Sequence, residues 1–288
     1  METKLNYKRT FLIGLAFLSI CSFWQMYDNI IPLILQNTYH LGETMTGAVM
    51  ALDNVLAIFL LPVFGTLSDK VHTKLGRRMP FIVVGTILAV IFMMLLPMID
   101  NAEKARWGTV ESFSNQVIFL AVLFFTLVSM GLYRSPAVAL MPDVTPNHLR
   151  SRANAVINLM GAVGGVYALI MIKVLVGKGE TPDYLPLFAS IAAVMAIAVG
   201  ILVITIRENK LREEVEKAEA AIAETIEEKA MAEGVEAVGE IEAVGDTGAV
   251  KASDGKKQTG KTEGTKGMPK EVKRSMYFML ASIFLWFT

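Results

Sequence analysis

Six long apolar runs constrain the fold of this chain more than any other feature of its sequence. They cover about residues 10–35, 44–67, 79–99, 115–141, 153–176 and 185–206. A helix needs about 20 mostly apolar residues to cross the hydrocarbon core of a bilayer, and each run is long enough. Backbone polar groups inside lipid must be hydrogen-bonded within the segment, and the alternation of barrel strands is absent, so we expect helices. The predicted fold class is an all-α integral membrane protein with a six-helix transmembrane bundle.

The composition agrees with a membrane protein and gives no sign of an enzyme. The 288 residues are 53% hydrophobic and 19% charged, and their formal net charge is zero. This is too apolar for an ordinary soluble domain, and it gives no reason to expect a nucleic acid as partner. The single cysteine, Cys21, excludes an intrachain disulfide. No dinucleotide, ATP or nucleophile motif and no metal-ligand cluster occurs, so we expect no enzyme activity, cofactor or metal.

The distribution of Lys and Arg predicts the orientation in the membrane. Nine of these cations precede the first run or lie in the second and fourth connections: Lys4, Lys8, Arg9, Lys70, Lys74, Arg77, Arg78, Arg150 and Arg152. The other three connections carry three: Lys104, Arg106 and Lys178. Because positively charged loops stay in the cytoplasm, we expect both ends of the six-helix unit there, in a multi-pass protein of the plasma membrane.

The composition changes after the sixth run and predicts three regions. Residues 1–206 form the transmembrane bundle, and residues 207–274 are expected to form a cytoplasmic helix followed by a flexible linker. Residues 275–288 begin another apolar run that is too short to span, and we interpret it as a truncated seventh helix. This order favours the amino-terminal half of a twelve-helix transporter, whose missing carboxy-terminal half is then the expected partner.

Three ionisable residues fall inside the predicted spans: Asp28, Asp53 and Arg134. A charge in lipid is costly, so each indicates a functional position. Counted from the span ends, all three are expected near the middle of the membrane, where Arg134 can pair with one acid. We interpret Asp28 and Asp53 as candidates for binding a coupling cation. The alternatives are a buried structural pair of Asp53 and Arg134, and an Asp28 that only reaches water.

Polar and aromatic side chains accompany these charges. The spacing i,i+4 places Trp24 with Asp28, and Gln25 with Asn29, on common helix faces. A water-filled cavity that binds a cation and hydroxyl groups explains the pattern. The candidate substrate-binding residues are Arg134, Trp24, Gln25, Tyr27, Asn29, Asn54 and Asn158. The alternative is that the amides and the phenol only form hydrogen bonds between helices.

Residues 65–80, GTLSDKVHTKLGRRMP, resemble the signature loop of the major facilitator superfamily. The matching residues are Gly65, Leu67, Asp69, Lys70, Gly76, Arg77 and Arg78. Residues 71–75 lengthen the loop, and with the following MPFI it is similar to the sucrose–proton and glycoside–pentoside–hexuronide cation symporter branches. A second segment, residues 133–165, is similar to the region between the fourth and fifth spans of the sucrose carriers.

The resemblance implies roles for these residues. The signature loop acts as a cytoplasmic latch that holds the outward-open state, with Asp69 facing a helix end of the other half. The implied latch residues are Gly65, Asp69, Lys70, Gly76, Arg77, Arg78, Asp143 and Arg150. The resemblance also implies that Arg134 binds sugar, whereas Asp28 and Asp53 have no assured counterpart.

The function expected from these features is secondary active transport of a sugar or glycoside with a proton or sodium ion, by alternating access. Two alternatives stay open. One is a major facilitator carrier of another small solute, such as a drug or organic-anion exporter. The other is a membrane sensor that does not transport, in which residues 207–274 bind a cytoplasmic partner.

Overall fold

The computed structural model describes residues 5–71, 73, 75–105, 113–177 and 182–232. Its candidate membrane spans are α1 (Tyr7–Asn37), α2 (Glu43–Met50) continued by α3 (Leu52–Lys70), α4 (Met79–Lys104), α5 (Phe113–Asp143), α6 (Arg150–Leu175) and α7 (Leu185–Thr205). Within these described ranges six segments are thus long and apolar enough to cross a membrane, which confirms the predicted all-α bundle. The second span is two helices that meet at Ala51.

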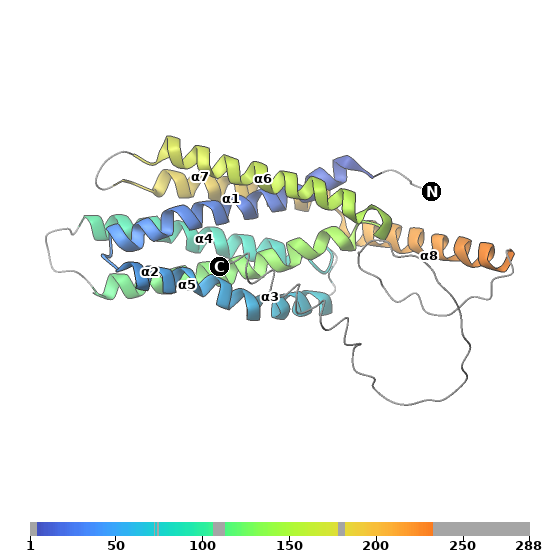
Figure 1. Ribbon diagram of the computed structural model, residues 1–288, viewed down its shortest axis with the longest axis horizontal. Helices are drawn as coiled ribbons and strands as arrows, with labels where there is room; N and C mark the ends of the chain where they lie inside the picture. The colour runs from blue at the N-terminus through green and yellow to red at the C-terminus, as the bar shows by residue number, and fades with distance from the viewer. Residues whose placement is uncertain (1–4, 72, 74, 106–112, 178–181, 233–288) are drawn as a thin grey trace, which may run out of the picture. The chain divides into compact units, whose positions relative to one another are not determined.

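The spans pack as two groups of helices. In one group α1 packs against α6 and α7, and in the other α5 packs against α4 and α3; contacts between α4 and α7 join the groups (Figure 1). A small residue allows the closest approach, because a Cβ on Gly164 of α6 would collide with the backbone of Leu18 in α1. Hydroxyl groups reinforce the packing: Ser22 Oγ donates to the Gly164 carbonyl (2.9 Å), and Ser19 Oγ lies 2.6 Å from Tyr133 Oη.

A buried ion pair fastens the ends of α1, α4 and α7. Asp100 of α4 is fully buried, and it accepts hydrogen bonds from Lys104 Nζ (2.6 Å) and Thr38 Oγ1 (2.7 Å). Lys104 Nζ also donates to the Pro182 carbonyl (2.6 Å) and lies 4.4 Å from the ring centroid of Tyr184. Because every charge in this group has a partner, the group can be buried without an isolated charge.

The bundle leaves apolar side chains of the second span exposed. In the most apolar stretch of this span no residue is buried, and Ile58 of α3 is 70% exposed. In a membrane such a surface is covered by lipid or by further helices.

After α7 the described part of the chain ends in the helix α8 (Glu208–Ala232), which begins at the same end of the bundle as α1 (Figure 1). It falls where the sequence predicts a charged helix. The predicted linker beyond it and the predicted seventh span lie outside the described residues.

Candidate functional site

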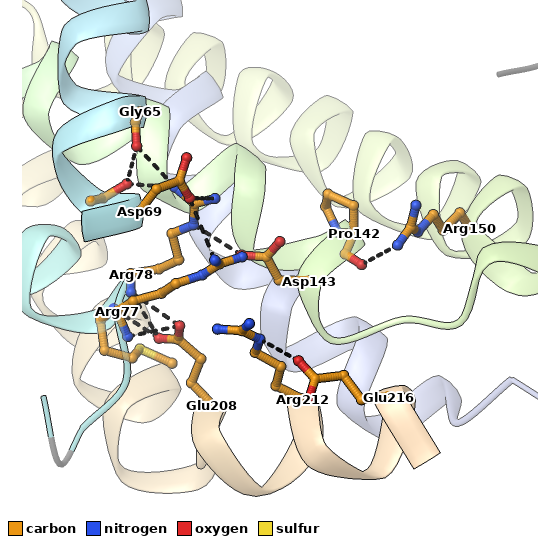
Figure 2. Close-up of polar contacts among 12 residues, drawn as sticks. Gly65, Asp69, Arg77, Arg78, Pro142, Asp143, Arg150, Glu208, Arg212 and Glu216 are labelled. Carbon is orange, nitrogen blue, oxygen red and sulfur yellow. Dashed lines mark hydrogen bonds and ion pairs between the residues drawn. The ribbon is translucent and has the colours of Figure 1, made fainter. Parts of the chain in front are cut away.

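Four charged residues of the signature loop and its neighbours meet where α3, α4 and α5 come together (Figure 2). Arg78 lies 2.6 Å from Asp69 Oδ1 through Nη2 and 2.9 Å from Asp143 Oδ2 through Nε. Arg77 Nη2 lies 2.9 Å from the same Asp143 oxygen, and its Nη1 lies 3.7 Å from Asp69 Oδ1. The two arginines therefore connect the end of α3 with the end of α5. We call Asp69, Arg77, Arg78, Asp143 and Glu208 the charge cluster.

Glu208, the first residue of α8, completes the charge cluster. Only 1% of it is exposed. Its carboxylate accepts the backbone N–H groups of Arg77 (2.9 Å), Arg78 (3.0 and 3.1 Å) and Met79 (3.1 Å). The first N–H groups of a helix have no partner inside the helix, and a carboxylate there also interacts favourably with the helix dipole. Glu208 is thus the cap of α4, supplied by another helix.

Sequence reasoning missed Glu208. Its sequence signal is an acid shortly after an apolar run, which is too common to single out a residue. Gly76 leaves space for the Glu208 carboxylate. Gly76 has a φ of 125° and forms paired backbone hydrogen bonds with Thr73. A Cβ at Gly76 would overlap the Glu208 carboxylate. Gly76 therefore meets both a conformational requirement and a steric one.

The charge cluster is partly buried, and its burial is uneven. The Arg78 side chain is 7% exposed and the Asp143 side chain 16%, whereas that of Asp69 is 48% exposed. Burial acts to lower the pKa of Arg77, but the hydrogen bond to Asp143 and the charges of Asp143, Asp69 and Glu208 outweigh it and raise that pKa. Arg77 thus stays cationic, and Asp69 keeps an accessible side.

Of the other predicted latch residues, Gly65 contacts the charge cluster and Arg150 does not. The Gly65 carbonyl and Ser68 Oγ accept hydrogen bonds from Arg78 Nη1. Lys70 is exposed. Arg150 lies apart: its side chain donates to the carbonyls of Pro142 (2.9 Å) and Thr145 (3.2 Å), and so braces the turn before α6 (Figure 2).

A second polar site lies within the membrane-spanning part. Trp24 of α1, Asp53 of α3 and Arg134 of α5 line one small cavity, whose remaining walls are mainly leucine side chains. The guanidinium carbon of Arg134 lies 5.5 Å from the Trp24 ring centroid, an arrangement that favours a cation–π contact. Within the part of the chain that the structure describes, Arg134 forms no ion pair with Asp28 or Asp53. The expected pairing of the arginine with an acid is therefore absent from this conformation.

Three buried polar atoms near this cavity have no hydrogen-bond partner: Trp24 Nε1, Tyr27 Oη and Asp53 Oδ1. Tyr27 is 1% exposed, and its ring centroid lies 5.4 Å from that of Trp24. Buried polar groups nearly always have a partner, so unpaired ones indicate a place where a ligand, ion or water binds. The cavity, of about 20 Å³, has room for about one water molecule in this conformation, and its lining offers both donors and acceptors.

The other predicted binding residues do not line this cavity. Asp28, Asn54 and Asn158 are exposed on the bundle surface. Asn29 Nδ2 donates to the Gln25 carbonyl one turn before it (2.7 Å). Among the described residues, the hydrogen bonds between spans include those of Ser22 and Tyr133 and one from Asn115 of α5 to Glu103 of α4, and the predicted amides contribute none. Among the described residues no three potential metal ligands lie together.

Comparison with known proteins extends this picture. The family model of the Major Facilitator Superfamily matches residues 6–288. Sucrose transport protein SUT3 of Oryza sativa subsp. japonica is 26% identical over 137 residues, which are 45% of this chain and 27% of the relative. Sucrose transport protein SUC4 of Arabidopsis thaliana is 34% identical over 116 residues, 38% and 22% of the two chains. The uncharacterized symporter sll1374 of Synechocystis is 24% identical over 144 residues, 48% and 25% of the two chains.

The matches to these relatives thus cover only about a quarter of their length. The family model, in contrast, spans nearly the whole chain. A helical membrane bundle is observed, and the signature-loop residues meet in one charge cluster. The chain belongs to the major facilitator superfamily.

Proposed function

We propose that this chain is part of a secondary active transporter that moves a sugar or glycoside together with a proton or sodium ion, by alternating access. The observation that carries the proposal is the cavity lined by Trp24, Asp53 and Arg134, beside which three buried polar atoms have no partner. A solute rich in hydroxyl groups supplies both donors and acceptors to such atoms. The names of the relatives, sucrose transport proteins and a symporter, support the same substrate class.

Each residue of the cavity has a distinct proposed role. Arg134 donates hydrogen bonds to sugar hydroxyls, and the Trp24 ring, held by its contact with the guanidinium, packs against the sugar ring. Asp53 takes the coupling cation, because its Oδ1 is buried in the cavity without a partner. Asp28 is the second candidate for the cation, but it is exposed and does not line the cavity.

The charge cluster is proposed to act as the conformational latch. Its buried Arg78 contacts Asp143 of α5, Glu208 of α8 and Ser68 of α3, and so holds these helix ends beside the start of α4. The half-exposed Asp69 is the member that can also reach a helix end of the other half of the transporter. Contacts of an exposed acid with a helix amino terminus contribute only about 0.3–1 kcal/mol, so they exchange readily during the transport cycle.

The arrangement in the membrane follows from the same proposal. We place the charge cluster, the amino terminus and residues 207–274 in the cytoplasm, with residues 1–206 as one half of the transporter and residues 275–288 as the start of its seventh span. The support is the excess of Lys and Arg in the connections at this end.

The test is uptake of radiolabelled sucrose and a panel of glycosides by the complete protein in proteoliposomes, with imposed proton or sodium gradients. We expect one gradient to drive accumulation and Asp53→Asn to abolish the coupling, while Asp28→Asn serves as the matched carboxylate control. Accumulation that survives Asp53→Asn and fails in Asp28→Asn would transfer the cation role to Asp28. No sugar flux from correctly inserted protein would instead favour a carrier of another solute.

A further inference from the structure

A cavity of about 280 Å³ lies where α8 crosses the start of α1 and the turn before α6. Its apolar walls come from three separate parts of the chain and include Ile13, Leu149, Leu211 and Val215. The residues that line it belong neither to the charge cluster nor to the mid-membrane cavity. A dry apolar cavity of roughly 150 Å³ already binds a molecule such as benzene, so this one has room for a larger apolar group.

The polar side of this cavity holds a cation that an anion can bind. Arg9, His148 and Glu214 line it. The amino-terminal ends of α1 and α6 lie beside it, and neither helix has an acid in its first turn. The positive ends of these two helix dipoles are therefore not compensated by side chains of their own first turns.

Two glutamates of α8 already contact the cation and a backbone N–H group beside this cavity. Glu214 Oε2 lies 2.9 Å from Arg9 Nη1, and the two side chains are 58% and 44% exposed. Glu219 Oε1 accepts the backbone N–H of Asn147 (3.1 Å). Pairs this exposed are weak and exchange easily. Glu214 thus occupies a position that an external anion can take.

We propose that this cavity binds an amphiphile with one anionic head group. Its alkyl chain fills the apolar cavity, and its head group displaces Glu214 from Arg9. A protein embedded in a bilayer meets such molecules as free fatty acids and as anionic phospholipids. Because the ligand and Glu214 compete for Arg9, binding loosens the middle of α8, whose first residue Glu208 caps α4. Membrane composition is thereby coupled to the helix that supplies this cap.

The test uses the whole protein in nanodiscs of neutral phospholipid with a photoactivatable diazirine analogue of decanoate, and the crosslinked peptides are mapped by mass spectrometry. We expect saturable labelling of residues 211–222 that decanoate prevents and decanol does not. Arg9→Gln should weaken the apparent affinity about tenfold, the effect of losing one charge-assisted hydrogen bond. Lys8→Gln is the matched control, since Lys8 does not line the cavity, and should change it less than about twofold.

Glu214→Gln gives the sharpest result, because it removes the internal competitor and should tighten binding several-fold. Val215→Trp should fill the cavity and prevent labelling, with a thermal-stability measurement to show that the variant is folded. Weaker binding in Glu214→Gln, equal protection by decanol, or equal losses in Arg9→Gln and Lys8→Gln would each overturn the proposal. If phosphatidylglycerol in the nanodisc competes with the probe, the ligand is a phospholipid; if only added fatty acid competes, it is the free acid, and either result supports the anionic site.

Discussion

Glu208→Ala provides the most direct test of how the charge cluster is held. The carboxylate is buried and accepts the N–H groups of Arg78 and Met79, which are also buried, together with that of Arg77. A buried donor left without an acceptor costs about 1–3 kcal/mol. Water can replace the carboxylate at Arg77, which is less buried. We therefore expect the substitution to lower the free energy of unfolding by about 3 kcal/mol.

The assay is equilibrium unfolding in mixed detergent micelles, followed by circular dichroism. Glu216→Ala is the control, since Glu216 lies on the same helix and forms an exposed pair with Arg212, 2.9 Å away. Such an i,i+4 pair contributes about 0.2–0.5 kcal/mol. Glu208→Gln keeps an acceptor oxygen but loses the charge, so its effect should lie between the two. If Glu208→Ala were no more destabilising than Glu216→Ala, α4 would not depend on this cap and the reasoning would be refuted.

Three further substitutions test other parts of the structure. Gly76→Ala should lower the free energy of unfolding by about 1–3 kcal/mol, because position 76 has a positive φ and a Cβ there overlaps Glu208. The loss should be smaller when Glu208 is already replaced by Ala. If the two losses were additive in the same unfolding assay, the steric part of the explanation would be wrong. Lys104→Met should lower the free energy of unfolding by about 3–5 kcal/mol, because it leaves the charge of the buried Asp100 without its ion-pair partner. The double variant Lys104→Met with Asp100→Asn should recover part of that loss, and no recovery in the same unfolding assay would show that the ion pair is unimportant. Arg134→Ala should abolish sugar uptake without reducing the amount of inserted protein, and uptake retained at the wild-type rate would remove Arg134 from the mechanism.

The candidate sites show where sequence reasoning reached its limit. Arg77, Arg78 and Asp69 were identified from the spacing of a loop motif, and the structure does bring them together with Asp143. Glu208 belongs to the same cluster but is separated from Arg78 by 130 positions along the chain. No local pattern indicates that an acid will cap a helix that begins so far away. Arg150, in contrast, lies close in sequence to Asp143, yet its guanidinium is directed to backbone carbonyls.

For the mid-membrane residues, too, the sequence identified candidate residues but not their contacts. The cost of a charge in lipid is enough to single out Asp53 and Arg134 in the sequence. It does not tell whether Arg134 contacts an acid or an aromatic ring, because that depends on how α1, α3 and α5 are rotated about their axes. The structure places the guanidinium over Trp24 and leaves Asp53 Oδ1 unpaired.

The sequence by itself determined the six spans, because crossing a hydrocarbon layer requires a long apolar run whose backbone is hydrogen-bonded within the segment. It also determined the charge asymmetry between the connections and the signature loop. Only the tertiary structure decided which helices adjoin, that α8 returns to cap α4 through Glu208, and that a cavity lies beneath α8. These features depend on contacts between residues that are distant in sequence, and burial and hydrogen bonding act through distance in space.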